Sequence, residues 1–440
     1  MLSYYIKLGL KRLGETPVLT LLILMAMALG IAVSVTMLAL HHAMAYNPAE
    51  EKSGRLFAVQ LAAYGNDMET WGEEDGLPIQ VTHRDAMNLR ESTIPLRQTP
   101  MFRMALTLES HRQDMPPSAD FVVRVADRDF FEMFGVNFVY GGPWDKTIDL
   151  DTARVAVINQ SVNEYAFGGG NNVGKILLMN ETEYRVVGIT EDSNPLPRYY
   201  DLTSGAYPIT PDSVFIPYSL APQLESFPNG NISGWAAEPV NEFADLLQTE
   251  FVWQVYWVEL PDAQAVAAYR DYLAGYVDQQ QQLGRFQNGQ ARGHIRDVQQ
   301  WLTYNRVIKD DNRVMVGLSF MFLLVCLVNT VGLLLARFLR RMNETGVRRA
   351  LGASKLQIFQ QYITEVSLLG LLGGGAGLLL SMVGLWGIRS LYTQYATIAY
   401  LDATMVAAAV AISLASSLIA GTYPAYRVCA AQPSLFLKAQ

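Results

Sequence analysis

The chain has 440 residues, of which 50% are hydrophobic and 17% are charged, and its formal net charge is −8 at pH 7. This balance excludes an ordinary soluble globular protein, which carries a larger share of charged residues. An acidic chain also offers no polybasic surface for DNA or RNA, so nucleic acid is excluded as a partner.

The N-terminal part is predicted to lie on a membrane and then to cross it. Residues 1–16 mix apolar and basic side chains, as in a cytoplasmic interfacial helix. Residues 17–44 form a first transmembrane segment, because the apolar run from Val18 to Leu40 exceeds a signal-peptide core and no cleavage pattern follows it promptly. The pair His41 and His42 has no third ligand at a useful spacing, which favours a membrane boundary over a metal site.

Residues 45–310 form a polar block without cysteine, so a large extracytoplasmic domain without disulfides is expected. Short strands and helices alternate along it, which indicates an α+β domain. Loops are expected from about 191 to 241, and beyond Arg292 a helix is expected to continue without a break into the second span as a stalk. Strands are predicted at 56–62, 101–109, 121–126, 154–159, 176–180, 183–189, 215–217 and 251–260, and helices at 82–90, 128–134, 161–167 and 262–282.

One stretch of this block has the form of a phosphate-binding loop. The run from Gly169 to Lys175 matches G-x-x-x-x-G-K, but Ile176 stands where Ser or Thr would bind magnesium. The run also follows a helix and opens a strand, which is the reverse of the order that the motif requires. No ATP binding is therefore predicted here, and no hydrolase, redox or metal motif is present elsewhere.

Three further spans are predicted at 311–338, 358–390 and 403–426, with a short external loop at 391–402 and a cytoplasmic tail at 427–440. Between residues 337 and 355, six basic residues stand against Glu344 alone. This excess places the connecting segment 339–357 on the cytoplasmic side, and the polar block on the opposite side, by the positive-inside rule.

The third span contains two overlapping G-x-x-x-G spacings, and small residues at such spacings let helices approach closely in lipid. This face is expected to pack against another helix, in the same or in a partner subunit; a merely flexible helix is the alternative. Asn329 and Glu365 are polar residues within or beside spans, and a structural role is favoured over a transport path. The predicted helix-packing residues are Gly370, Gly373, Gly374 and Gly377.

The segment 339–357 is predicted to contain a short amphipathic helix that begins with Asn343 as its N-cap and ends at Gly352. Val347, Ala350 and Leu351 then share one side, while the two central arginines point elsewhere. From the residues alone, a topological anchor and a protein-docking helix are equally supported.

The run from Glu344 to Ser354 resembles the E-I-G-(I/V)-R-R-A-(I/L)-G-A signature of the MacB/FtsX-like permeases, the macrolide-exporter and lipoprotein-release type of ABC transporter permease. In that family the segment is the coupling helix that contacts a cytoplasmic ATPase. Thr345 departs from the signature, where an apolar residue is usual. Phrases in the polar block and the run from Tyr423 to Arg427 also resemble this family. The resemblance implies as ATPase-coupling residues Glu344, Gly346, Val347, Arg348, Arg349, Ala350, Leu351 and Gly352.

The resemblance implies an α-helical inner-membrane protein with four transmembrane helices and a large periplasmic α+β domain, in which a porter-like subdomain receives a mostly β insertion at about 125–221. It implies a non-enzymatic permease that dimerises with a second copy or a paralogue and couples hydrolysis by a separate ATPase, which holds the ATP and magnesium, to efflux or extraction of a cargo by mechanotransmission. A periplasmic adaptor and an outer-membrane channel stay open as partners. The alternative is a membrane sensor whose outer domain binds a ligand and signals to a cytoplasmic partner.

Overall fold

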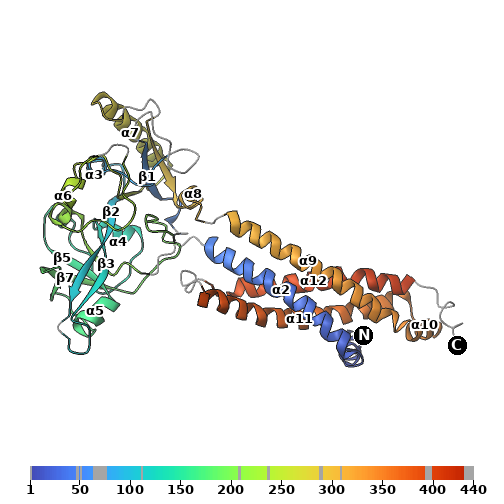
Figure 1. Cartoon of the computed structure of the whole chain (residues 1–440). Helices are drawn as coiled ribbons and strands as arrows, with labels where there is room; N and C mark the ends of the chain where they lie inside the picture. Colours follow the sequence, from blue (N-terminus) through green and yellow to red (C-terminus); the bar gives the residue numbers. More distant parts are fainter. Residues whose placement is uncertain are drawn as a thin grey trace. The chain divides into compact units, whose positions relative to one another are not determined.

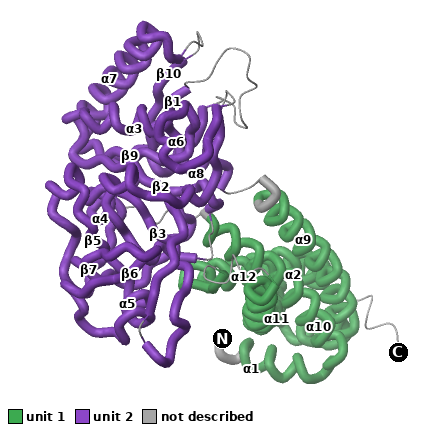
Figure 2. Tube along the Cα trace, turned by 60° about the vertical axis from the view of Figure 1, so that its left-hand side comes forward, with its two compact units in different colours: residues 1–45, 308–440 green, residues 46–307 purple. Residues whose placement is uncertain are grey.

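The computed structural model describes residues 2–45, 49, 52–62, 77–110, 112–206, 210–234, 238–286, 291–307, 310–391 and 399–430. It divides the chain into two compact units, residues 1–45 with 308–440, and residues 46–307 (Figure 2). Most of the predicted external loop 391–402 and of the predicted tail 427–440 lies outside the described residues.

The first unit is helical (Figure 1). Four of its helices, α2, α9, α11 and α12, are long and apolar enough to cross a membrane, which confirms the predicted number of spans. The third is 37 residues long and extends well beyond the roughly 20 residues that a bilayer needs. The helices are α1 (Leu2–Leu13), α2 (Pro17–Ala45), α9 (Asp310–Leu339), α10 (Met342–Ala350), α11 (Lys355–Leu391) and α12 (Ala403–Ala430).

Helix α11 lies between α2 and α12, and its apolar residues form one core with theirs. Met27 and Ile31 of α2 belong to this core together with Val366 and Leu369 of α11, and all four are buried. The outward faces are apolar as well, as the exposed Met321 of α9 illustrates. A helix bundle that is hydrophobic on its outside is suited to lipid rather than to water.

The second unit is built on one ten-stranded sheet with the order β10-β1-β9-β2-β3-β8-β5-β7-β4, in which β6 pairs with β2 and β7. The mixture of parallel and antiparallel pairs with short helices confirms the predicted α+β domain. The strands are β1 (Leu56–Ala62), β2 (Arg97–Glu109), β3 (Ser118–Ala126), β4 (Phe138–Gly141), β5 (Val155–Asn159), β6 (Ile176–Met179), β7 (Thr182–Thr190), β8 (Val214–Pro217), β9 (Val255–Glu259) and β10 (Arg292–Asp297).

Helices α7 (Ala263–Gln282) and α8 (Val298–Tyr304) contact β10, and α4 (Asp129–Met133) contacts β2 near the centre of the sheet. Further short elements join the remaining strands. At the β10 end, buried residues of α3 and α7 pack against β1, β9 and β10. The helices are α3 (His83–Leu89), α4 (Asp129–Met133), α5 (Gln160–Phe167), α6 (Phe243–Leu246), α7 (Ala263–Gln282) and α8 (Val298–Tyr304), with the 3-10 helices η2 (Lys146–Asp149) and η3 (Tyr218–Gln223).

The predicted helix beyond Arg292 is wrong. Residues Arg292–Asp297 form strand β10, which pairs antiparallel with β1 and buries Ile295 opposite Val59. Helix α8 then begins with a capping box of Asp297 and Gln300 and ends at Asn305. Arg306, with a φ of +47°, breaks the helical path before α9. Ile295 is the one large apolar residue of this stretch, so no helical apolar period is present, and β1 supplies the backbone partners of a strand.

Strands between residues 125 and 221 continue the same sheet as β2 and β3, since β8 pairs with β3 and β5 pairs with β8. The bounds of the predicted insertion therefore stay a prediction. Strand β9 begins at Val255, so it is shorter than predicted, and β4 was not predicted at all.

Candidate functional site

The predicted coupling segment 339–357 contains helix α10, which lies between α9 and α11 in the chain. It begins two residues earlier than predicted, because the amide of Thr345 already donates to the carbonyl of Arg341. Arg341, not Asn343, is the N-cap residue, and it makes no side-chain cap. The predicted stop is present, since Gly352 has a φ of +101°, a conformation that favours glycine.

One face of α10 is exposed and apolar. Val347 is 49% exposed and Leu351 is 83% exposed, and Ala350 and Gly352 are exposed beside them. Gly346, by contrast, is buried. Exposed leucine and valine side chains at helical spacing form a surface that a partner protein can cover. Their role in ATPase docking stays a prediction.

The polar side chains of α10 bind to the rest of the helical unit. Arg348 donates to Gln361 of α11 over 2.8 Å, and Arg349 donates to the carbonyl of Cys429 in α12 over 3.4 Å. The hydroxyls of Thr345 and Tyr362 share a hydrogen bond of 2.8 Å. The departure from the family signature at Thr345 therefore supplies a contact to α11. Helix α10 is thus fastened to two of the spans, a feature that the sequence did not indicate.

A second group of contacts joins α10 to the N-terminal helix. Arg12 of α1 forms an ion pair and a hydrogen bond with Glu344. Glu344 also pairs with Arg348 at 3.0 Å, one turn along the same helix. The predicted coupling residue Glu344 is therefore engaged within the chain.

Glu365 of α11 lies at the centre of the same charged region. Its carboxylate is 2.8 Å from Arg337 of α9 and 3.4 Å from Arg341, and the side chains of Glu365 and Arg337 are buried. A buried carboxylate that faces two guanidinium groups is consistent with the structural role predicted for Glu365. Asn329 is exposed on the outside of α9.

The predicted glycine positions divide into two faces of α11. A Cβ at Gly370 or Gly374 would collide with Ser417 or Ser413 of α12. A Cβ at Gly377 would lie 3.0 Å from the Cβ of Ile31, and one at Gly373 would lie 3.1 Å from the Cβ of Met27, both in α2. The two G-x-x-x-G spacings therefore serve two different neighbours within one chain.

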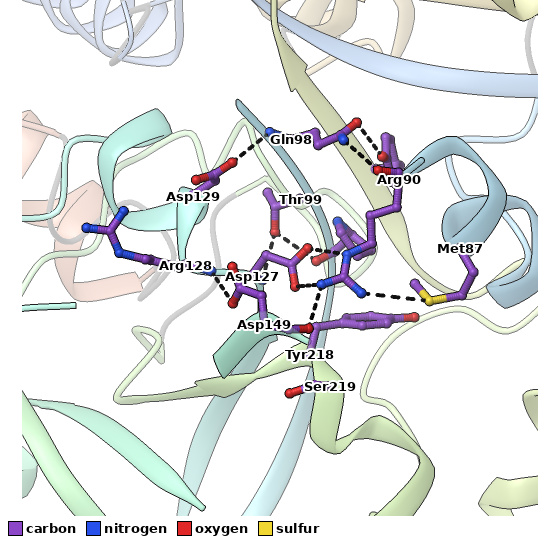
Figure 3. A network of polar contacts seen from close by, with 12 residues as sticks. Met87, Arg90, Gln98, Thr99, Asp127, Arg128, Asp129, Asp149, Tyr218 and Ser219 are labelled. Carbon is purple, nitrogen blue, oxygen red and sulfur yellow. Dashed lines mark hydrogen bonds and ion pairs between the residues drawn. The ribbon is translucent and has the colours of Figure 1, made fainter. Parts of the chain in front are cut away.

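The second unit, which is the predicted outer domain and is called the outer domain below, contains a polar network at the end of α3 (Figure 3). Arg90 donates to both carboxylate oxygens of Asp127, each over 2.7 Å, and to the carbonyl of Asp149 over 2.9 Å. Its guanidinium group also lies over the ring of Tyr218. The backbone amide of Asp127 donates to Thr99 of β2 over 3.0 Å. The network ties α3, β2 and the ends of β3 and η2 together, which is a structural role.

His83 lies close to this network. Its Nδ1 is 2.8 Å from the hydroxyl of Tyr218, and its ring stacks with those of Tyr218 and Trp253. Burial, with the nearby charge of Arg90 as a second cause, lowers the pKa of His83 from 6.5 to about 4. The side chain is therefore neutral at pH 7.

A separate group of five charges is buried under the loops between β7 and β8. Arg124 of β3 contacts Asp201 at 2.5 Å and Asp212 at 2.9 Å. Arg198 and Arg103 lie 3.3 and 3.4 Å from Asp212. Burial acts to raise the pKa of Asp212, but the arginines, Arg124 first, outweigh it and the pKa is lowered. No group of three or more His, Cys, Asp or Glu that could hold a metal ion occurs in the described parts of the chain.

Family models match both units. The MacB-like periplasmic core domain matches residues 20–276, and the FtsX-like permease C-terminal region matches residues 316–433. The chain is similar to the macrolide export ATP-binding/permease protein MacB of Burkholderia lata, with 25% identity over 81% of this chain and 46% of that protein. It is also similar to the uncharacterized ABC transporter permease YvrN of Bacillus subtilis, with 23% identity over 82% of each chain. The chain thus spans about half the length of the curated MacB relatives.

Among solved structures, the periplasmic region of MacB from Actinobacillus actinomycetemcomitans matches with a TM-score of 0.35 and 13% identity, covering 58% of this chain and 94% of that one. The extracellular domain of the noncanonic ABC-type transporter YknZ from Gram-positive bacteria matches with a TM-score of 0.34 and 12% identity, covering 54% of this chain and 99% of that one.

Proposed function

Because the chain belongs to the family of ABC transporter permeases that combine a MacB-like periplasmic core domain with an FtsX-like C-terminal region, we propose that it transmits movement from a separate cytoplasmic ATPase to its outer domain. ATP and magnesium bind to that ATPase, and its dimerisation displaces α10. The spans carry the displacement across the membrane. The outer domain then acts on a periplasmic or membrane-extracted cargo, so the chain needs no nucleotide site of its own.

The observation that carries this proposal is the combination of an exposed apolar face and firm internal attachment in α10. Val347 and Leu351 are open to a partner, while Arg348 and Thr345 bind α11. A partner that binds the exposed side of such a helix and moves it also displaces α11, which is bonded to the other side. A loop that only anchors the topology needs neither the apolar face nor the bonds to α11.

The proposal includes a second permease chain, either a copy or a paralogue, because a dimerising ATPase presents two equivalent docking surfaces. In the macrolide export relatives, as their name states, ATP-binding and permease functions belong to one protein. For this chain we propose efflux or extraction as the outcome. Membership of the permease family favours this function over the membrane sensor.

The docking test is Leu351→Asp, which places a charge at the most exposed apolar position of the segment. We expect the variant to reach the membrane but to co-purify with on the order of tenfold less ATPase, as for the loss of an apolar anchor at an interface. Leu150→Asp is the matched control, since Leu150 is an equally exposed leucine of the outer domain. Unchanged ATPase recovery with Leu351→Asp contradicts the proposal.

A further inference from the structure

The N-terminal helix α1 is bonded to the coupling helix α10 and to the C-terminal end of α9. The buried side chain of Arg12 pairs with Glu344 of α10. The backbone carbonyl of Arg12 accepts hydrogen bonds from Arg337 over 3.1 Å and from Arg341 over 3.0 Å. Arg341 also pairs with Glu15 at 2.9 Å, just beyond the end of α1. Residues more than 300 positions apart in the sequence therefore meet here.

Glu365 fixes this group to α11. Arg337, which lies 2.8 Å from Glu365, also donates to Thr20 of α2 over 2.8 Å. One arginine of α9 thus contacts α1, α2 and α11 at once. Gly9 of α1 adds a packing contact, because a Cβ at that position would lie 2.7 Å from a methyl group of Leu368 in α11.

Charges of both signs meet in this group. Four arginines, at positions 12, 337, 341 and 348, pair with three glutamates, at positions 15, 344 and 365. Arg337 and Glu365 are both buried, so removing either one leaves an uncompensated buried charge. This buried pair therefore resists separation.

We infer that Arg12 is a positioning residue for the coupling helix: its pair with Glu344 makes α1 part of the body that the ATPase moves, with Glu365 as the attachment of that body to α11. This inference rests on the proposed function. A displacement of α10 then reaches α2 through α1 and reaches α11 through Glu365. The N-terminal helix therefore moves together with α10 and is not only a membrane anchor.

The test is a charge exchange in the full chain, co-purified with its ATPase and reconstituted in lipid nanodiscs, with MgATP as the probe. Arg12→Glu and Glu344→Arg are made singly and together. We expect each single variant to retain its ATPase but to lower kcat for ATP hydrolysis on the order of tenfold, at an unchanged KM for ATP. The double variant is expected to restore kcat to within about threefold of the wild type, because the ion pair forms again with reversed polarity.

Lys11→Glu is the matched control, since Lys11 is an exposed neighbour of Arg12 on the same helix. It is expected to leave kcat unchanged. If a reversed variant does not accumulate, Arg12→Gln and Glu344→Gln form an equivalent cycle, in which the double variant should be no slower than either single one.

The inference is overturned if the fold-loss in kcat of the double variant equals the product of the two single fold-losses. It is also overturned if Arg12→Glu has wild-type kcat. A loss of bound ATPase in proportion to the lost rate also overturns it, because docking and not positioning would then explain the result. If the wild-type chain itself recovers no ATPase, the proposed function has failed, and the inference fails with it.

Discussion

Gly374 of α11 faces Ser413 of α12 so closely that no side chain fits between the two helices, whereas the next residue, Gly375, faces open space. Gly374→Leu is therefore expected to separate α11 from α12 and to destabilise the helical unit by about 1–3 kcal/mol, as overpacking of a close contact does. The thermal unfolding midpoint in detergent measures this effect.

Gly375→Leu provides the control, because it makes the same chemical change on an exposed side of the same helix. It should leave the midpoint near that of the wild type. Equal destabilisation by both variants would mean that glycine content, and not the contact with α12, determines stability here.

Arg124 is expected to be the most sensitive charged residue of the outer domain. Arg124→Met leaves Asp201 and Asp212 buried with one cation fewer, which should lower the free energy of unfolding by about 3–5 kcal/mol. Denaturant unfolding followed by tryptophan fluorescence measures the change. Arg185→Met, at an exposed position of β7, is expected to alter it by no more than about 0.5 kcal/mol.

His83 should make the stability of the outer domain depend on pH. The unfolded chain takes up a proton at this residue below pH 6.5, whereas the folded protein does so only near its lowered pKa of about 4. The stabilising effect is complete above pH 6.5 and is lost as the pH falls toward 4, with a total on the order of 3 kcal/mol. Denaturant midpoints at several pH values should fall less steeply for His83→Gln. Parallel curves for the two proteins would contradict the assignment.

The orientation in the membrane has a direct chemical test. A cysteine at Asn229, which is exposed in the outer domain, should react with a membrane-impermeant maleimide in intact spheroplasts. A cysteine at Ala350, which is exposed on α10, should react only after permeabilisation. The two natural cysteines are buried and serve as the background. Reaction of both positions in intact cells would invalidate the predicted orientation.

Local patterns were sufficient where neighbouring residues determine the backbone. The apolar run at β1 was predicted as a strand with its observed bounds, and the helix after Thr82 is capped by that residue as its position suggests. The left-handed conformation of Gly352 was likewise predictable from its place after a short helix. The exposed apolar side of α10 follows from the helical period of Val347, Ala350 and Leu351.

Distant pairings could not be predicted in this way. Strand β10 forms because β1 lies beside it, although paired residues of the two strands lie 230 to 240 positions apart in the sequence. Arg348 was expected only to point away from the apolar side, and its acceptor, Gln361, is known from the structure alone. The pair of Arg12 and Glu344 spans 332 positions, and no spacing rule connects them. Polar contacts of this kind depend on the tertiary arrangement.

The use of both glycine faces of α11 within one chain limits how two permease chains can meet inside the bilayer. The glycines at positions 370, 373, 374 and 377 face α2 or α12, so a second chain of the proposed dimer meets other outward residues, such as the bulky Met321 and Val325 of α9. Bulky surfaces keep backbones farther apart than glycine does. The proposed second chain can therefore bind to and leave such a surface without opening the glycine contacts inside a helical unit.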